Sequence, residues 1–180
     1  SNVEATQNIV FPKQDNEEVL LINNAAKISN IVPLNLQKET DIVNDYNLNI
    51  ISPTLLCSKF INEFKSKKKI IINISSGAAN NSVACWATYC AAKAALDRLT
   101  NVLSEENHPK LSVFSVHPGV VDTKMQEGIR SSNPQLFPLW HKFISYYANK
   151  ELEHPNTIAL KLLYIIKNHT KFHQNILSIR

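Results

Sequence analysis

The chain has 180 residues, of which 44% are hydrophobic and 19% charged, and its formal net charge is +4. This length fits one domain with a sizeable core, and the composition excludes a disordered chain. The three cysteines form no CxxC pair and the six histidines have no HExxH spacing, which argues against a disulfide framework and a metal site. Because a signal peptide and a membrane-spanning apolar run are also missing, we expect a soluble cytoplasmic protein with a single domain over residues 1–180.

The first part of the chain predicts one strand and one long helix. Residues 1–18 are mostly polar without a period, and the apolar run Val19–Ile22 then predicts a buried parallel strand. Apolar residues recur near helical spacing over residues 38–66, which predicts a helix. Pro53 falls inside this helix and should bend or interrupt it close to Asn49, because proline removes a backbone hydrogen bond.

The rest of the chain alternates strands and helices. The β-branched run Ile70–Ile74 is the clearest strand, and Ser75-Ser76-Gly77 ends it. The elements that follow are a helix at 86–106, a strand at 111–116, a loop with short helices at 122–150, a helix at 156–167 and a strand at 176–179. Such alternation is typical of an α/β fold with a mostly parallel sheet and helices on both faces.

The basic run Lys65–Lys69 is the most concentrated charge in the sequence, and it lies between two apolar segments. A solvated helix end explains it, because cations favour the negative end of a helix dipole. A nucleic-acid surface usually interleaves such charges with aromatic residues, and this run has none. We therefore expect no nucleic-acid partner.

Glycine is scarce, with only Gly77, Gly119 and Gly128 in the chain. A phosphate-binding loop needs closely spaced glycines, which let the backbone approach a pyrophosphate. These three glycines lie far apart, so the chain contains no such loop.

Tyr89 and Lys93 are the first candidates for chemistry. They lie four residues apart on a predicted helix and therefore share one face. A nearby ammonium lowers the pKa of a phenol, so the pair could donate a proton to a developing alkoxide. The same spacing also occurs on many helices where the tyrosine is merely packed and the lysine solvated.

Three strand ends strengthen this interpretation. Ser76 ends a predicted strand thirteen positions before Tyr89, His117–Thr123 follows the next strand, and Asn23–Ala26 follows the first. Each could be an ordinary turn. Together they meet at the carboxyl edge of one parallel sheet, where open α/β folds place ligands.

In these segments the chain resembles the short-chain dehydrogenases/reductases, and it is most similar to their sepiapterin and benzil reductase branch. Asn23-Asn24-Ala25-Ala26 resembles the family's NNAG motif, and Asn49 falls where the family keeps a helix asparagine. Ser76 with Tyr89 and Lys93 matches the family's serine and YxxxK motif. Pro118, Gly119, Val121 and Thr123 match PGxVxT.

The resemblance implies a Rossmann-like, doubly wound parallel sheet in three α/β/α layers and an NADPH-dependent reduction of a small carbonyl substrate. It implies that Tyr89 protonates the carbonyl oxygen, Ser76 orients it and Lys93 lowers the tyrosine pKa and holds the nicotinamide ribose. Asn49 would anchor a water that links Lys93 to solvent. The remaining roles are cofactor binding by Asn23, Val121, Thr123, Met125 and Gln126, substrate binding by Gly77 and Gly119, and homodimer formation through the helices at 38–66 and 86–106.

The segment 127–150 carries several aromatic residues, including Phe137, Phe143 and Trp140. They could cover an aromatic substrate or pack as a lid.

The chain departs from the family in two ways. Ala26 stands where the family usually has glycine, and the family's first three strands with their GxxxGxG loop are missing. Val19–Ile22 should then form an apolar sheet edge, and such edges aggregate. We therefore expect a longer gene product, which an intact mass would test against 20.3 kDa. A truncated, non-catalytic remnant that acts as an interaction subunit is the alternative, and a titration with NADPH would discriminate the two.

Overall fold

Four parallel strands form the centre of the computed structural model, which describes residues 3–13 and 15–180. The strands are β1 (Glu18–Asn23), β2 (Lys68–Ile74), β3 (Leu111–His117) and β4 (Ile176–Ser178), and they lie side by side in chain order. All three pairings are parallel. The predicted α/β class with a parallel sheet is therefore confirmed.

The sheet is buried in its middle and covered on both faces. Ile70, Ile71 and Ile72 of β2 are almost completely buried, because this β-branched run lies between two neighbouring strands. Successive side chains of a strand point to opposite faces. Accordingly, Ile71 joins a core that contains Phe60 of one helical layer, while Ile70 and Ile72 join a core that contains Ile165 of the other.

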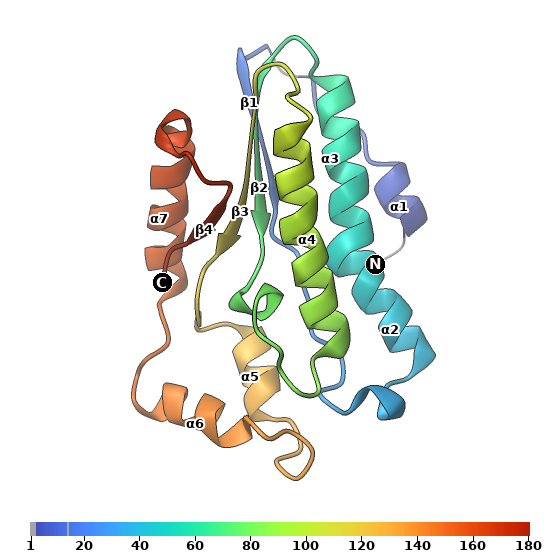
Figure 1. Ribbon diagram of the computed structural model, residues 1–180, viewed down its shortest axis with the longest axis vertical. Coiled ribbons are helices and arrows are strands. Elements are labelled where there is room, and N and C mark those ends of the chain that lie inside the picture. Colours follow the sequence, from blue (N-terminus) through green and yellow to red (C-terminus); the bar gives the residue numbers. More distant parts are fainter. Residues whose placement is uncertain (1–2, 14) are drawn as a thin grey trace.

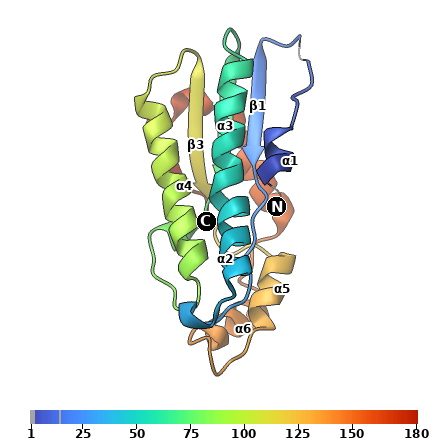
Figure 2. The ribbon, with the colours of Figure 1, turned by 90° about the vertical axis from the view of Figure 1, so that its right-hand side faces the viewer.

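Helices flank the sheet in two layers, as Figures 1 and 2 show. One face carries α2 (Glu39–Tyr46), α3 (Ser52–Glu63) and α4 (Ala87–Glu105), and the other carries α7 (Pro155–Lys167). The short helices α5 (Lys124–Arg130) and α6 (Trp140–Ala148) lie below the carboxyl ends of the strands in the view of Figure 1. The expected three-layer α/β/α arrangement is confirmed.

The long helix expected at 38–66 is interrupted, as the position of Pro53 predicted. A π-helical turn at Asn47–Ile51 separates α2 from α3, and Pro53 lies in the first turn of α3, where its missing N–H is tolerated. Asn49 is buried in the π turn, and its side-chain amide bonds both backbone groups of Lys27 at 3.0 and 2.8 Å. The irregular turn thus anchors the segment that follows β1.

The start of the chain contains a helix that the sequence did not predict. The short helix α1 (Val3–Gln7) contacts α3, and Phe11 behind it packs against the rings of Phe60 and Phe64 at centroid distances of 5.6 and 5.8 Å. A helix of five residues has too little periodicity to be recognised from sequence.

β1 forms an edge of the described sheet. Leu20 and Ile22 on its outward face are each 42% exposed, whereas Val19 is buried against α3. The expected apolar sheet edge is therefore present.

Candidate active site

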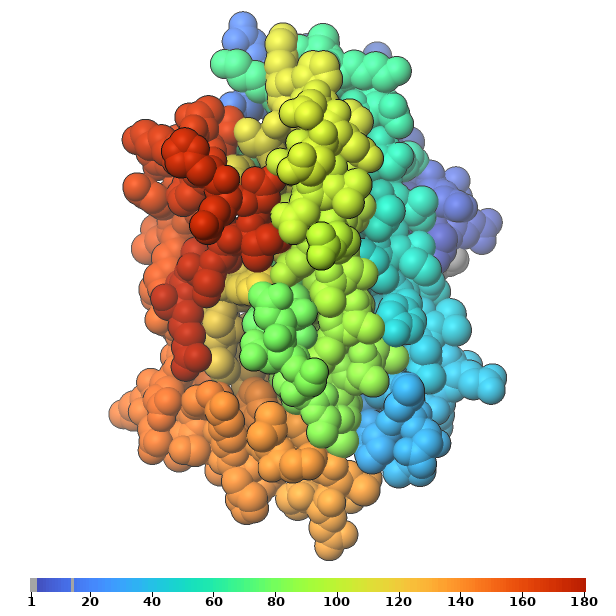
Figure 3. All heavy atoms as spheres, in the orientation of Figure 1, coloured from blue at the N-terminus to red at the C-terminus, as the bar shows by residue number. Residues whose placement is uncertain are grey.

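A cleft of about 520 Å³ opens at the carboxyl ends of the strands. Its wall combines the ends of β1 and β2, the start of α4, the loop behind β3, helix α5 and one side of α7. In Figure 3 the loop after β2 (green) and the α5–α6 segment (orange) lie next to each other at this end of the molecule. Of the residues expected to form a site, the cleft brings together Ser76, Tyr89, Lys93, Gly119, Val121, Thr123, Met125 and Gln126.

Ser76 is positioned by the end of β2. Its backbone is extended, and its hydroxyl oxygen accepts a 3.1 Å hydrogen bond from the backbone N–H of Ala78. This bond caps the 3₁₀ turn Gly77–Ala79, so the serine is held in one place. The hydroxyl also forms a side-chain hydrogen bond with Tyr89.

Tyr89 lies in the first turn of α4 and is buried against the indole of Trp86, with the ring centroids 5.8 Å apart in an edge arrangement. Burial raises its pKa to about 12, although the hydrogen bond with Ser76 acts to lower it. The net shift is upward because loss of phenolate hydration dominates, and the lowering of this pKa by Lys93 stays a prediction. The phenol is protonated at neutral pH and can donate its proton.

Lys93 follows one turn later and is only 2% exposed. Its Nζ atom lies 5.5 Å from the centroid of the Tyr89 ring and donates a 2.7 Å hydrogen bond to the carbonyl oxygen of Ile74. Burial lowers the pKa of Lys93 to about 8, and the negative charge of Asp97 acts in the opposite direction. The cation is thus fixed beside the phenol and still mostly protonated at neutral pH.

The loop behind β3 provides the opposite wall. Gly119 has a φ of +82°, a conformation that strongly favours glycine and turns the chain away from the strand. A β-bridge pairs Val121 with Glu153, and Thr123 is the N-cap residue of α5. Because α5 starts at the cleft, Thr123, Met125 and Gln126 all reach its wall.

Three of the expected site residues do not line the cleft. Asn23 instead donates to Asn73 at 2.8 Å, which links β1 to β2 inside the sheet. Asn49 uses its side chain to hold Lys27, as described above, and Gly77 lies exposed behind Ser76.

The structure adds cleft residues that sequence reasoning missed. Trp86 and the apolar side of α7, with Ile158 and Leu162, complete the wall. The helical period of α7 predicts an apolar face but not what that face covers. Trp86 lies three residues before Tyr89, on the same side of α4, and this spacing was the available signal.

The aromatic residues of the 127–150 segment form a packed base beside the cleft. Phe137 and Phe143 are buried against Trp86, with ring centroids 5.9 and 5.4 Å from it. They do not line the cleft, so they pack against one another beside it and do not cover a substrate directly.

Two buried polar atoms in the cleft wall have no hydrogen-bond partner among the described residues. They are the indole donor Nε1 of Trp86, in a residue 7% exposed, and the amide acceptor Oε1 of Gln126, in a residue 8% exposed. Buried polar groups usually find partners, so both atoms fit a ligand that offers an acceptor and a donor.

A nicotinamide with its ribose meets part of this requirement. Its carboxamide can donate a hydrogen bond to Oε1 of Gln126, and Lys93 can donate further hydrogen bonds to ribose hydroxyls, which leaves the indole donor of Trp86 for an acceptor on the substrate. The pyrophosphate half of a dinucleotide finds no glycine-rich loop, because Gly119 is the one glycine of the chain in the cleft wall. The residues present therefore fit the reactive half of such a cofactor.

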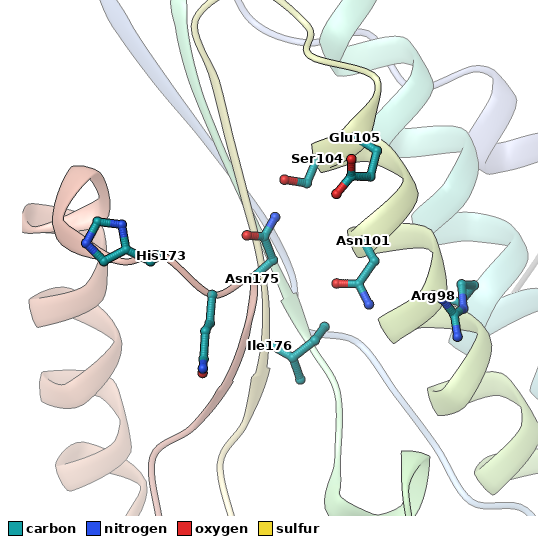
Figure 4. A pocket seen from close by; sticks show the side chains of 8 residues that line it. Arg98, Asn101, Ser104, Glu105, His173, Asn175 and Ile176 are labelled. Carbon is teal, nitrogen blue, oxygen red and sulfur yellow. The ribbon is translucent and has the colours of Figure 1, made fainter.

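A second depression of about 550 Å³ lies between α4 and the segment that leads into β4, as Figure 4 shows. Arg98, Asn101 and Glu105 of α4 face it together with His173 and Asn175. It shares no lining residue with the cleft.

Neither a metal centre nor a membrane helix is found in the part of the chain that the structure describes. No three His, Cys, Asp or Glu side chains there gather closely enough to hold a metal ion. No described helix is long and apolar enough to cross a membrane.

Comparison with known proteins agrees with this geometry. The family model described as short chain dehydrogenase matches residues 14–134. Benzil reductase ((S)-benzoin forming) of Bacillus subtilis is 34% identical over 85% of this chain and 65% of its own length. Sepiapterin reductase of Rattus norvegicus is 35% identical over 86% of this chain and 60% of its own length.

A solved structure of 4-hydroxyisoleucine dehydrogenase complexed with NADH is also similar. It is 26% identical with a TM-score of 0.66, and the match covers 89% of this chain and 66% of that one. The chain thus spans less than two thirds of the length of the two reductases it matches.

Proposed function

Because the chain belongs to the short chain dehydrogenase family, we propose that it carries the proton-transfer half of an NADPH-dependent oxidoreductase that reduces a ketone or α-diketone. The observation that carries the proposal is the meeting of Ser76, Tyr89 and Lys93 in one cleft at the carboxyl edge of the sheet. The similarity to benzil and sepiapterin reductases supports the substrate class.

Each of the three side chains has a task in this reaction. Ser76 donates a hydrogen bond to the carbonyl oxygen of the substrate and orients it. Tyr89 transfers its phenolic proton to that oxygen as negative charge develops on it, and Lys93 stabilises the phenolate left behind. A bound nicotinamide cofactor supplies the hydride that reduces the carbonyl carbon.

The cofactor side of the cleft is the wall formed by the loop behind β3 and by α5. We assign Lys93 to the ribose hydroxyls and Val121, Thr123, Met125 and Gln126 to the nicotinamide and the adjoining phosphate. Asn23 contributes by fixing the end of β1, since its amide is bonded inside the sheet. The preference for NADPH rests on the reductase branch alone.

Gly119, in the loop behind β3, borders the substrate, and Gly77 shapes the turn that holds Ser76. We also propose that Asn49 anchors a water that relays protons from Lys93 to solvent, because its two hydrogen bonds with Lys27 fix its side chain and leave one amide N–H and one oxygen lone pair open.

The test is the oxidation of NADPH by the purified chain with benzil, sepiapterin and a simple ketone as substrates. Turnover that depends on Tyr89 supports the proposal. A calorimetric titration with NADPH accompanies it, because binding only by a longer polypeptide would favour the non-catalytic remnant for this chain.

We also propose a homodimer that pairs the α2–α4 faces of two copies. Val43, Ile51 and Val102 are large apolar residues exposed on this layer, between 40 and 57%. Sedimentation velocity tests the proposal: Val102→Lys should convert a dimer into a monomer, and an exposed control, Leu160→Lys on α7, should not.

A further inference from the structure

A second group of buried polar side chains lies along α4, one turn beyond Lys93. Its centre is the carboxylate of Asp97, which is buried against the sheet. Oδ1 of Asp97 accepts a 2.5 Å hydrogen bond from the hydroxyl of Ser115, and Oδ2 lies 2.8 Å from Nε2 of His117. Both partners belong to β3, so they hold the carboxylate between helix and strand.

Ser75, directly behind β2, connects this carboxylate with Lys93. Its hydroxyl donates a 3.4 Å hydrogen bond to the backbone carbonyl of Lys93, and the same side chain acts to lower the pKa of Asp97. The Nζ atom of Lys93 bonds the preceding residue of the strand, Ile74. The ammonium is thus fixed to the end of β2 and the carboxylate to the neighbouring end of β3, one helical turn apart on α4.

The charge of Asp97 acts on Lys93, which lies one helical turn before it on α4. Burial lowers the pKa of Lys93 to about 8, and the charge of Asp97 raises it. Burial also acts to raise the pKa of Asp97, but hydrogen bonds with His117, Ser115 and Ser75 together lower it. Asp97 is therefore negative at neutral pH, which favours the charged form of Lys93.

The surroundings of Asp97 leave few other charges to consider. The neighbouring strands supply Ser75, Ser115 and His117, and α4 itself supplies Lys93. β4, which contacts α4, consists of Ile176, Leu177 and Ser178 and adds no ionisable side chain.

We infer that Asp97 is a positioning residue for the proposed reduction: its buried negative charge, one helical turn from Lys93, keeps Lys93 in its ammonium form beside Tyr89. This inference rests on the proposed function for its catalytic consequence, whereas the charge coupling belongs to the chain alone. Asp97 acts through Lys93 and does not line the cleft.

The coupling can be measured without turnover, by NMR titration of lysine ¹³Cε signals in the full chain. Lys93→Met identifies the Lys93 signal among the 16 lysines. In Asp97→Asn the pKa of Lys93 should fall from about 8 by about one pH unit. The matched control Ser115→Ala removes a hydrogen bond but keeps the carboxylate, so it should leave the Lys93 pKa close to that of the wild type.

A second measurement tests the inference if Asp97→Asn does not fold. Because coupling between two sites is reciprocal, Lys93→Met should raise the pKa of Asp97, measured from its ¹³C carboxyl signal. An unchanged Lys93 pKa in folded Asp97→Asn overturns the inference. If that variant does not fold, an unchanged Asp97 pKa in Lys93→Met overturns it.

Activity then separates the two proposals. In Asp97→Asn the alkaline limit of NADPH-dependent reduction should move to lower pH, with a lower kcat and an unchanged KM for the carbonyl substrate. Absence of reduction by the wild type as well as by every variant, together with the NMR shifts, rejects the proposed function and leaves the Asp97–Lys93 coupling intact.

Discussion

The amine of Lys93 donates a 2.7 Å hydrogen bond to the carbonyl oxygen of Ile74, the last residue of β2. Ser76 lies two residues after Ile74 in the chain. The end of β2 therefore positions both the hydroxyl of Ser76 and the ammonium of Lys93, which flank Tyr89. A lysine held in this way cannot swing into solvent to keep its charge. Its protonation is therefore set by the interior of the cleft.

Reduction should weaken as the pH rises through about 8. The folded-state pKa of Lys93 lies near 8, below its ordinary value of 10.5, so the ammonium is present below this pH and lost above it. Tyr89, with a pKa of about 12, stays protonated over the same range and does not explain the loss. The measurement is kcat/KM from about pH 6 to about pH 10. A constant value up to the alkaline end would show that the charge of Lys93 is not required.

Tyr89→Phe should abolish reduction of benzil, with a loss of at least about 100-fold in kcat, because the proton donor is removed. NADPH affinity should stay largely intact, since the ring and its packing on Trp86 remain. Steady-state kinetics and a calorimetric titration measure the two effects. Tyr164→Phe on the exposed face of α7 is the matched control. Near-normal turnover of Tyr89→Phe rejects tyrosine as the donor.

Trp86→Phe should reduce the preference for an α-diketone over a simple ketone by about fivefold, the effect of one hydrogen bond of about 1 kcal/mol. The change removes the unpaired Nε1 donor from the cleft wall and keeps an aromatic ring against Phe137. The ratio of kcat/KM for benzil and a monoketone measures it.

Trp140→Phe is the control for this prediction. The indole of Trp140 already donates a 2.9 Å hydrogen bond to the carbonyl oxygen of Arg130, so its removal should lower stability without changing selectivity. Equal ratios in wild type and Trp86→Phe mean that the second carbonyl oxygen does not bind the indole.

Asn23→Ala should lower the free energy of unfolding by about 1–3 kcal/mol, because Asn73 loses a buried partner. Chemical denaturation measures this loss, and calorimetry with NADPH measures binding. Asn24→Ala, at an exposed position in the cleft wall, should show the reverse pattern of normal stability and altered binding. A large loss of NADPH affinity in Asn23→Ala at normal stability would restore a direct cofactor role for Asn23.

The strands and long helices were predictable because each has its own pattern of apolar residues. The isoleucine run of β2 and the alanine- and leucine-rich α4 are examples, and Pro53 located the break near Asn49. The positions of the strand ends also predicted that Ser76, Tyr89 and Lys93 line one cleft, because parallel strands end at the same edge of a sheet.

How deeply each site residue is buried could not be predicted from the sequence. The sign of the Tyr89 pKa shift depends on how completely Trp86 and its neighbours exclude water, and this packing involves residues distant in the chain. Asn23 was misplaced for a similar reason: its partner Asn73 lies on the neighbouring strand, fifty residues away. Asp97 was overlooked although it lies four residues after Lys93, because His117 and Ser115, which hold it, come from β3.

The π turn at Asn47–Ile51 has a consequence for the register of the helices around it. A π bulge is equivalent to one residue inserted into a regular helix, and each residue of an α-helix turns the chain by about 100°. Deleting one residue there would let α2 and α3 fuse into a continuous helix. With Phe60 kept in the core, α2 would rotate by that angle and carry Asp45 away from Ser29 and Thr88. The single extra residue thus aligns two helix faces that no regular helix could present together.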